Sequence, residues 1–446
     1  VLGNNRYSRC MRFMAADVAN ATGGALVGQN AHLSGVSFDT RTITPGQLFV
    51  PIVAERDGHE FIETALKSGA GAYLTQRDPV GRSAIVVDDT LAALLKLGAW
   101  ARVRLEPAVG SRVIGVTGSV GKTSTKDFIA AALSSELVVA ASEKSFNNDQ
   151  GLPVTLLNAA DNSQALVLEM GMRGFGEIAR LCSIGRPAIG VVTAVAAAHT
   201  ERVGGIEGVA RAKAELVQAL PQSGFAILNA DDERVREMRN LTQAQVLTYG
   251  VHESADIRIT KCELDEMARA SVSATTPWGN VSWAMAVPGA HMALNAAAAI
   301  AVSGVCGVNI HSAAAALEQS SVSPMRMQVI TTDDGMTIIN DAYNANPASM
   351  RAALDTLVGM KASRHVVIAG QMAELADSSA EHNAIVEYAR SKSIEFIACE
   401  TSNYETPSLS VEDAVKHVRD GGTDVAVLVK GSRVAALERV VQLLIG

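Results

Sequence analysis

The feature that most constrains the fold is an apolar run that breaks into a glycine-bearing turn and then into Gly121-Lys122-Thr123. Residues 113–117 predict a buried strand, and residues 127–133 indicate a helix that begins at about Thr123. Such a strand, turn and helix aim several backbone N–H groups at one point, where a polyphosphate binds. The strict phosphate-loop pattern has Gly where this chain has Val116, so we predict a Thr-Gly-x-x-Gly-Lys-Thr variant of the loop.

The residues of this turn are candidate ligands for ATP and its Mg²⁺ ion. Lys122 would reach the β- and γ-phosphates, and the Thr123 hydroxyl would bind the cation, because a hard cation prefers oxygen ligands. The alternative is a chance Gly-Lys-Thr turn, against which the flanking strand and helix argue. The predicted ATP-binding residues of the loop are Gly118, Ser119, Val120, Gly121, Lys122, Thr123 and Ser124.

Length and charge limit the classes of protein to which the chain can belong. A chain of 446 residues predicts two or three domains. A formal net charge of −8, with no block of Lys and Arg, argues against a nucleic-acid partner. Five scattered cysteines without a C-x-x-C spacing indicate neither a disulfide framework nor a structural zinc site, and they favour a reducing cytoplasm.

Two segments bear on membrane attachment. Residues 292–308 form the most apolar long segment, but alanine, which dominates it, is too weakly apolar for a membrane span. Residues 1–10 are polar and basic with no apolar core after them, so we expect a disordered arm and no signal peptide. The sequence therefore predicts no membrane span.

Residues 11–108 predict a small N-terminal α/β domain that ends near Pro107. Within it, Ser37, Thr40 and Arg41 gather two hydroxyls and a guanidinium at a strand end, an arrangement suited to a phosphate or pyrophosphate. Taken alone, such a cluster is more often a solvated turn. The expected elements are helix 14–21, helix 61–68, strands 72–75 and 84–87, and helix 91–103.

Residues 109–323 alternate strands and helices as a central, doubly wound and mostly parallel sheet requires. Ligands of such sheets bind at the carboxyl ends of the strands, where this chain has Asn147 and Asn148, Glu169 and His199. Glu169 ends an apolar strand, where a lone carboxylate needs a cation unless it simply emerges into solvent. A lone histidine such as His199 is more often an ordinary core or surface residue than a ligand. The expected strands are 137–140, 165–168, 188–192 and 225–228.

Two further regions complete the organisation. Residues 246–287 lose helical periodicity and alternate β-branched residues and tryptophan, which predicts a small antiparallel insert before the alanine-rich helix. Residues 324–446 alternate again and predict a C-terminal, Rossmann-like α/β domain with a second, smaller parallel sheet. Its expected strands are 336–339, 366–369, 394–398 and 425–429.

Seven short motifs occur in an order that resembles the Mur ligases, and the match runs from about Met11 to the C-terminus. They are Thr117-Gly118-Ser119-Val120-Gly121-Lys122-Thr123, Asn147-Asn148-Asp149-Gln150-Gly151-Leu152-Pro153, Glu169-Met170-Gly171, Ala198-His199-Thr200-Glu201, Ala212-Lys213-Ala214-Glu215, Asp341-Ala342-Tyr343-Asn344-Ala345-Asn346-Pro347 and Lys430-Gly431-Ser432-Arg433. Together with Asp39-Thr40-Arg41 and Asp57-Gly58-His59, they resemble the branch of the family that adds D-alanyl-D-alanine.

The resemblance implies an ATP-dependent ligase that joins UDP-N-acetylmuramoyl-tripeptide to D-alanyl-D-alanine in peptidoglycan precursor synthesis. It implies a cytoplasmic enzyme, which we expect to be a monomer. The N-terminal domain would bind the UDP-sugar substrate, the central domain ATP, and the C-terminal domain would bind the acceptor and close over ATP. Forming an amide in water is uphill, so ATP would first convert the carboxylate into an acyl phosphate that the amine then attacks.

The resemblance also implies roles for individual residues. Thr123 and Glu169 would hold one Mg²⁺, Glu169 and His199 a second, and Lys122 would act on the phosphates. Lys213 is similar to the family lysine that CO₂ modifies to a carbamate. The remaining implied ATP contacts are Asn295 for adenine, Arg326 for phosphate and Asp341 for ribose. The implied substrate contacts are Ser37, Thr40, Arg41, Asn147, Asn148, Tyr343, Asn344, Asn346 and Lys430.

Some stretches depart from the family pattern. Gly370-Gln371-Met372-Ala373-Glu374-Leu375-Ala376 lacks a carboxylate and a glycine of the usual stretch, which puts acceptor-side roles there in doubt. Met325-Arg326 stands where the family has Gly-Arg, His291-Met292 replaces a His-Asn pair, and the loop before Asp57 is shortened. Two alternatives stay open: another Mur or folylpolyglutamate-type ligase that adds a single amino acid, and a non-catalytic nucleotide-binding regulator.

Overall fold

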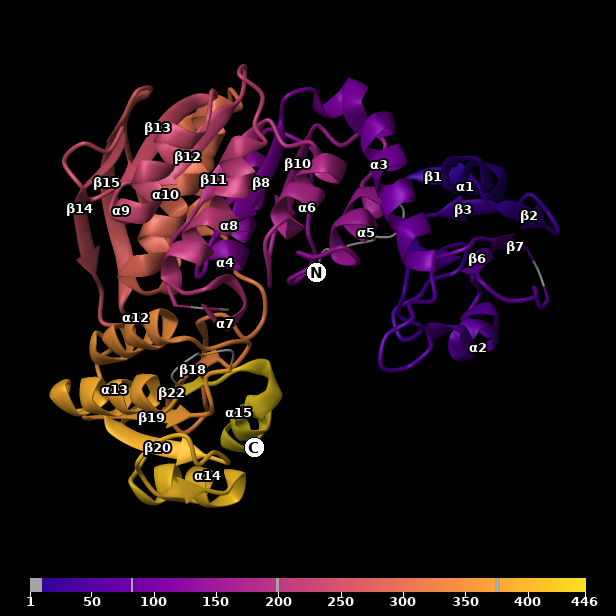
Figure 1. Cartoon of the computed structure of the whole chain (residues 1–446). Helices are drawn as coiled ribbons and strands as arrows, with labels where there is room; N and C mark the ends of the chain where they lie inside the picture. The colour runs from indigo at the N-terminus through magenta and orange to yellow at the C-terminus, as the bar shows by residue number, and fades with distance from the viewer. Residues whose placement is uncertain (1–9, 82, 198–199, 374, 376–377) are drawn as a thin grey trace.

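The computed structural model of the chain describes residues 10–81, 83–197, 200–373, 375 and 378–446. The predicted arm, apart from its last residue, and the predicted ligand His199 lie outside these ranges. Three large sheets follow one another along the chain, and a central part adjoins an N-terminal part on one side and a C-terminal part on another (Figure 1). The predicted three-domain α/β fold is confirmed.

A five-stranded sheet in the order β2-β7-β6-β5-β4 forms the N-terminal part. All neighbours in it are parallel except β2 and β7. Its strands are β2 (Ala25–Val27), β4 (Val36–Ser37), β5 (Leu48–Phe49), β6 (Ala72–Thr75) and β7 (Ala84–Val86). The other elements are α1 (Ala15–Thr22), the 3₁₀ turn η2 (Gly58–Phe61), α2 (Ile62–Lys67), α3 (Thr90–Val109), and a separate antiparallel pair, β1 (Arg12–Met14) with β3 (His32–Ser34).

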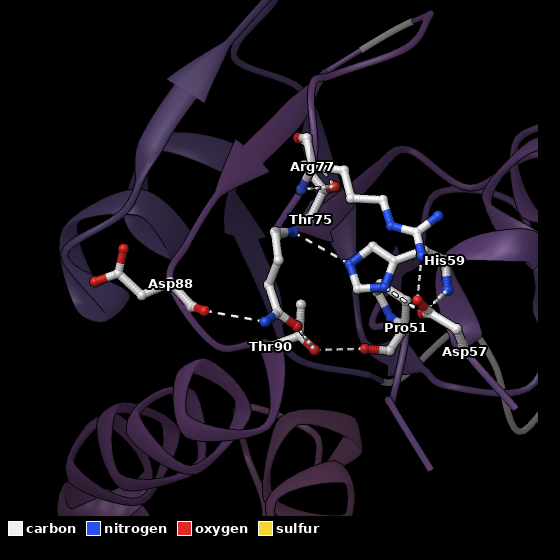
Figure 2. A network of polar contacts seen from close by, with 8 residues as sticks. Pro51, Asp57, His59, Thr75, Arg77, Asp88 and Thr90 are labelled. Carbon is white, nitrogen blue, oxygen red and sulfur yellow. Dashed lines mark hydrogen bonds and ion pairs between the residues drawn. The ribbon is translucent and has the colours of Figure 1, made fainter. Parts of the chain in front are cut away.

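The Asp57-Gly58-His59 motif fastens a turn to the N-terminal sheet (Figure 2). Asp57 Oδ1 accepts a hydrogen bond from the His59 N–H at 2.9 Å and lies 2.6 Å from His59 Nδ1. His59 Nε2 accepts a hydrogen bond from the Gln76 N–H at 3.1 Å. Because a backbone N–H only donates, Nε2 carries no proton and Nδ1–H donates to Asp57. Arg77 pairs with the second oxygen of Asp57, so the motif holds η2 against the end of β6.

Helix α3 connects the N-terminal and central parts, and it is longer than predicted. The expected end of the helix at residue 103 is wrong, because α3 continues through Pro107 to Val109. Leu105 and Val109 are fully buried and extend the apolar face of the helix by another turn. Burial of that face therefore outweighs the loss of one backbone N–H at the proline.

The N-terminal and central parts share one hydrophobic core, which includes residues of α1, α3, β5, β8 and β10. Asn158 reinforces this interface: its Oδ1 accepts a hydrogen bond from the Val36 N–H at 2.7 Å, and its Nδ2 donates to the Val36 carbonyl at 3.0 Å. The Met11 N–H donates to the Ala159 carbonyl at 2.9 Å. A shared core and these bonds make the two parts a continuous packed unit.

Nine strands form the central sheet, in the order β16-β15-β14-β13-β12-β11-β8-β10-β9. All neighbours from β9 to β14 are parallel, and β15 and β16 continue the sheet in antiparallel fashion. The strands are β8 (Val113–Thr117), β9 (Val139–Ala141), β10 (Ala165–Glu169), β11 (Ile189–Val192), β12 (Phe225–Asn229), β13 (Gln245–Gly250), β14 (Ile257–Leu264), β15 (Arg269–Thr276) and β16 (Gly279–Pro288).

The prediction of a separate antiparallel insert over residues 246–287 is wrong in its placement. Strands β13 and β14 extend the parallel sheet, and only β15 and β16 are antiparallel. Alternate residues of β14, β15 and β16, among them Ile257, Val272 and Trp283, are buried in the same core as the central sheet. This alternating burial is against the core of the central sheet. The segment therefore lies in that sheet and does not form a core of its own.

Helices cover both faces of the central sheet, as a doubly wound fold requires. On one face, α4 (Lys122–Leu133) packs against α10 (Ala290–Val305), whose residues 296–302 are fully buried. The alanine-rich segment is therefore a core helix. The remaining helices of this part are α5 (Gly151–Asn158), α6 (Glu177–Gly185), α7 (Thr200–Val203), α8 (Ile206–Gln218), α9 (Glu233–Glu237), η3 (Met238–Leu241) and α11 (Ile310–Glu318). Within the described ranges, none of the helices is long and apolar enough to cross a membrane.

A six-stranded sheet in the order β17-β18-β22-β19-β20-β21 forms the C-terminal part. Only the edge strand β17 is antiparallel, so the predicted smaller parallel sheet gains one antiparallel strand. The strands are β17 (Gln328–Thr331), β18 (Thr337–Asp341), β19 (Arg364–Ala369), β20 (Glu395–Cys399), β21 (Ser408–Leu409) and β22 (Val425–Lys430). The helices are α12 (Pro347–Val358), α13 (Ser378–Ser391), α14 (Val411–Asp420), η4 (Arg433–Ala435) and α15 (Glu438–Ile445).

Candidate active site

A cleft of about 600 Å³ lies where the central and C-terminal parts meet, at the carboxyl ends of β8 and β10. The phosphate loop forms one wall, and residues after β18 and β22 form the other. The predicted site residues that line it are Gly118, Ser119, Val120, Gly121, Lys122, Thr123, Ser124, Asn147, Asn148, Glu169, Lys213, Arg326, Tyr343, Asn344 and Asn346. Together with Ser432 and Arg433, which also line it, the cleft unites residues from six of the seven motifs.

The geometry of the phosphate loop explains its departure from the strict pattern. Val116 belongs to β8 and is fully buried, so the loop itself begins only after Thr117. A Cβ on Gly118 would lie 1.8 Å from Thr193 Oγ1, and Gly121 has a φ of +80° with the Asn295 carboxamide beside it. Glycine is required at both positions, by contact at the first and by backbone conformation at the second.

Hydrogen bonds tie the loop to the segment that follows β11. The Ser119 N–H donates to the Ala194 carbonyl at 2.7 Å, and Ser119 Oγ donates to the Ala196 carbonyl at 3.0 Å. Thr193 Oγ1 donates to the Val120 carbonyl at 2.5 Å. The loop is thus fixed from outside before any ligand binds, which is the preorganisation that a phosphate site needs.

Glu169 is a buried carboxylate with one free oxygen. It ends β10 with 1% exposure, and its Oε1 accepts a hydrogen bond from Asn147 Nδ2 at 2.8 Å. Its Oε2 is buried and has no hydrogen-bond partner among the described residues. Leaving a buried charged acceptor unpaired costs more than about 1–3 kcal/mol. This side chain is therefore suited to a cation in the cleft.

Lys122 and Lys213 present two buried or half-buried amines to the same cleft. Lys122 Nζ donates to its own loop at the Gly118 carbonyl, 2.7 Å away, and desolvation lowers its pKa while Glu169 opposes that shift. Lys213, on α8, is 2% exposed, and burial, followed by repulsion from Lys122, lowers its pKa well below the usual value.

The donor set of the cleft fits Mg²⁺ held partly by phosphate. Among the described residues, no three His, Cys, Asp or Glu side chains gather into a metal site. Glu169 Oε2 and the Thr123 hydroxyl offer two oxygen ligands at the cleft. Mg²⁺ is commonly bound by one or two carboxylates together with substrate phosphates and water, so the residues present fit such an ion. His199 lies outside the described residues.

Arg326 reaches from the C-terminal part to the phosphate loop. Its Nη2 lies 3.4 Å from Thr123 Oγ1, and its guanidinium stacks over the Tyr343 ring at 4.2 Å. Its Nε is buried without a hydrogen-bond partner among the described residues. A planar cation held over an aromatic ring, with one donor unpaired, is poised to bind an anionic group.

Met325 and Met327 flank this arginine with φ angles of +61° and +50°. A left-handed conformation costs a residue with a side chain roughly 1–2 kcal/mol. We expect Met325→Gly to leave the free energy of unfolding unchanged or to raise it by about 1 kcal/mol, because Met325 is only half-buried.

Met327 provides the matched control, because it has the same backbone conformation and is only 2% exposed. Met327→Gly should lower the free energy of unfolding by about 2 kcal/mol, since it removes a buried side chain. Denaturant unfolding of both variants measures the difference. Equal destabilisation of the two would contradict backbone strain at Met325.

Several predicted site residues lie outside the cleft lining. Asn295 touches Gly121 from behind the loop. Asp341 forms an ion pair with Lys430, whose amine also donates to the Asn344 carbonyl at 2.9 Å, so both residues support the wall of the cleft. Ser37, Thr40 and Arg41 lie in the N-terminal part, where Ser37 is buried at the end of β4 and Arg41 is exposed and paired with Asp39.

Some residues of the cleft were not predicted. Arg180 on α6 forms two hydrogen bonds with Asp149, at 2.8 and 2.5 Å. Arg173, Ser432 and Arg433 also line the cleft. Asp149, Ser432 and Arg433 belong to motifs that the sequence displays, whereas the two arginines near α6 have no local pattern that distinguishes them from surface residues.

Comparison with known protein families agrees with this arrangement. A family described as the Mur ligase middle domain matches residues 116–303. A second, described as the Mur ligase, glutamate ligase domain, matches residues 325–446. The first match includes the phosphate loop, and the second includes Arg326 and the residues after β18 and β22, so both walls of the cleft fall within them.

Relatives and solved structures give the same result. The chain is 40% identical over 406 residues to the UDP-N-acetylmuramoyl-tripeptide--D-alanyl-D-alanine ligase of Mycobacterium tuberculosis strain H37Rv, covering 83% of this chain and 79% of the relative. It is 34% identical over 439 residues to the Escherichia coli K12 ligase of the same name, covering 94% of this chain and 96% of the relative.

A crystal structure of MurF from Acinetobacter baumannii superposes with a TM-score of 0.87 at 26% identity, covering 98% of this chain and 99% of that structure. MurF from Thermotoga maritima in complex with ADP gives 0.79 at 25%, covering 92% and 96%. The chain therefore belongs to the Mur ligase family.

Proposed function

We propose that the chain is an ATP-dependent ligase that adds D-alanyl-D-alanine to UDP-N-acetylmuramoyl-tripeptide. The observation that carries the proposal is the cleft itself, in which Lys122, the free oxygen of Glu169 and Arg326 face one another across two parts of the chain. This set of charges suits the transfer of a phosphoryl group to a carboxylate. The printed names of the relatives support the choice of substrates.

The residues of the cleft have complementary parts in the reaction. Lys122 and the loop N–H groups bind the phosphates, and Arg326 closes on them from the C-terminal part. Glu169 and Thr123 would hold Mg²⁺, which when bound neutralises phosphate charge; His199 would contribute to a second ion. The γ-phosphoryl group passes to the substrate carboxylate, the amine attacks the acyl phosphate, and phosphate leaves.

The three domains divide the substrates among them. Residues 11–108 bind the UDP end of the muramoyl substrate, with Ser37, Thr40 and Arg41 facing the diphosphate. Residues 109–323 bind ATP, and the proposed adenosine contacts are Asn295, beside Gly121, and Asp341, which pairs with Lys430. Residues 324–446 bind the acceptor and close over ATP, with Tyr343, Asn344, Asn346 and Lys430 at the boundary.

Lys213 is proposed to be a carbamate in the active enzyme. A neutral amine attacks CO₂, and burial together with repulsion from Lys122 favours the neutral amine. The product is an anion in the cleft that Glu169 also lines, where it would support a cation. We expect a cytoplasmic monomer, and the five cysteines, all described and all unpaired, suit a reducing compartment.

Product analysis tests the proposed function. The parent chain, given ATP, Mg²⁺, the muramoyl tripeptide and D-alanyl-D-alanine, should release ADP and phosphate and yield a muramoyl pentapeptide. Single amino acids offered as acceptors should give no product, and tripeptides that end in diaminopimelate or lysine establish which is preferred. Product formed only with single amino acids would favour another ligase of the family, and ATP binding without release of ADP would favour a regulator.

A further inference from the structure

A buried ion pair on the phosphate-loop helix has no part in the chemistry above. Lys126 and Asp127 are neighbours on α4, with side chains only 3% and 16% exposed, and Lys126 Nζ lies 2.6 Å from Asp127 Oδ1. The same amine donates to the carbonyls of Ser142, at 2.8 Å, and Lys144, at 3.3 Å. Three acceptors therefore fix Lys126, and Lys126 in turn fixes one oxygen of Asp127.

The second oxygen of Asp127 binds the linker between the central and C-terminal parts. Asp127 Oδ2 accepts hydrogen bonds from the Ser323 N–H at 2.7 Å and from Ser323 Oγ at 2.8 Å. Ser323 lies in the linker between α11 and β17. Two bonds from one residue to one carboxylate oxygen constrain both the position and the orientation of the linker backbone.

This contact lies on a short physical path between Lys122 and Arg326. Asp127 is five residues along α4 from Lys122, a rise of about 7.5 Å. Ser323 is three residues before Arg326, and three residues span at most about 10 Å. The backbone between them includes the left-handed Met325, a conformation that persists only where neighbouring contacts impose it.

We propose that Asp127, oriented by Lys126, is a positioning residue that anchors the interdomain linker to the phosphate-loop helix, so that Arg326 reaches the phosphates. The inference deepens the proposed function, on which its kinetic readout rests. Asp127 touches neither substrate nor reacting atoms. It acts by positioning Arg326, whose Nη2 lies 3.4 Å from Thr123 Oγ1.

Kinetics of substituted enzymes test the proposal. Asp127→Ala should lower kcat by about 10-fold or more with the KM for the muramoyl substrate within about twofold of the parent, because the N-terminal part is untouched. Asp127→Asn keeps one oxygen for the two Ser323 bonds but sets an N–H donor against the Lys126 amine, so its kcat should lie between those of Asp127→Ala and the parent. The control is Asp413→Ala, which removes another serine-bonded carboxylate, 2.7 Å from Ser410 Oγ, far from the linker and should leave kcat unchanged.

A double-mutant cycle of Asp127 and Ser323 distinguishes a positioning role from a general loss of stability. Ser323→Ala should lower kcat in the parent and have no further effect in the Asp127→Ala background. Additive losses, or an Asp127→Ala enzyme with the parental kcat, would overturn the proposal.

Hydrogen exchange provides a readout that needs no reaction. Amides of residues 319–327 should exchange at least about tenfold faster in unliganded Asp127→Ala than in the parent, while those of α14 stay unchanged. Unchanged exchange in the linker would also overturn the proposal. If exchange rises as expected but the parent makes no pentapeptide, the anchor stands and the proposed function fails.

Discussion

Lys122→Ala should abolish turnover while leaving the muramoyl substrate able to bind. Lys122 is the cation of the phosphate loop, at the start of α4, and its amine lies among the loop carbonyls and the Glu169 carboxylate. Phosphoryl transfer depends on charge neutralisation, so loss of this amine should lower kcat by at least about 10³-fold, roughly 4 kcal/mol of transition-state stabilisation. Release of phosphate measures kcat, and calorimetry measures binding of the muramoyl substrate.

The control for this substitution is Lys261→Ala. Lys261 is an exposed lysine on β14, paired with Glu263 and remote from the cleft, so its loss should leave kcat at the parental value. Binding of the muramoyl substrate to Lys122→Ala should also be parental, because its UDP end is assigned to a separate part of the chain. A Lys122→Ala enzyme within tenfold of the parent would show that the loop is not central to the reaction.

The phosphate loop was predictable because its signal is local. A buried strand, a turn with glycines and a helix start are all encoded within the residues from Val113 to Thr125. The same holds for Glu169, which ends β10, and for Asn147, which lies in the loop after β9. The carboxyl ends of parallel strands share one edge, so residues after β8 and β10 meet even though the sequence separates them.

Contacts between distant segments could not be predicted in this way. Asp127 and Ser323 are 196 residues apart, and neither lies in a motif that indicates the other as its partner. The pairing of Arg180 with Asp149 is similar, since an arginine on an amphipathic helix has the same local pattern whether it faces solvent or a cleft. The packing of α6 beside the loop after β9 is what places Arg180 at the cleft.

Two errors in the elements have one physical cause. The end of α3 was placed too early, at residue 103, and β13 to β16 were assigned to an insert. In both cases local propensity was outweighed by burial: Val109 continues an apolar helix face, and Trp283 alternates into the core of the central sheet. Tertiary burial of this kind routinely overrides local signals.

Lys213→Ala should remove most activity, and short aliphatic acids should restore part of it. Lys213 is 2% exposed and lines the cleft, and burial lowers the pKa of its amine. A cation in the same cleft as a divalent ion would be repelled by it, which would weaken binding of that ion. Carbamylation forms an N–C bond with CO₂ and releases a proton, which replaces that repulsion with attraction.

Lys213→Arg is the matched control, because it keeps a positive charge and cannot form the carbamate at this position. We expect it to be as slow as Lys213→Ala and to respond to neither acetate nor formate. Carbon NMR of the parent in ¹³CO₂-equilibrated buffer should show a carbamate signal that is absent from both variants. An active Lys213→Arg enzyme would mean that a cation is what the site needs, and a fully active Lys213→Ala enzyme would remove Lys213 from the mechanism.

Burial alone does not decide between these outcomes, since it lowers the pKa of the amine in either case. The sign of the charge that the site requires does decide, and these two substitutions differ in that charge.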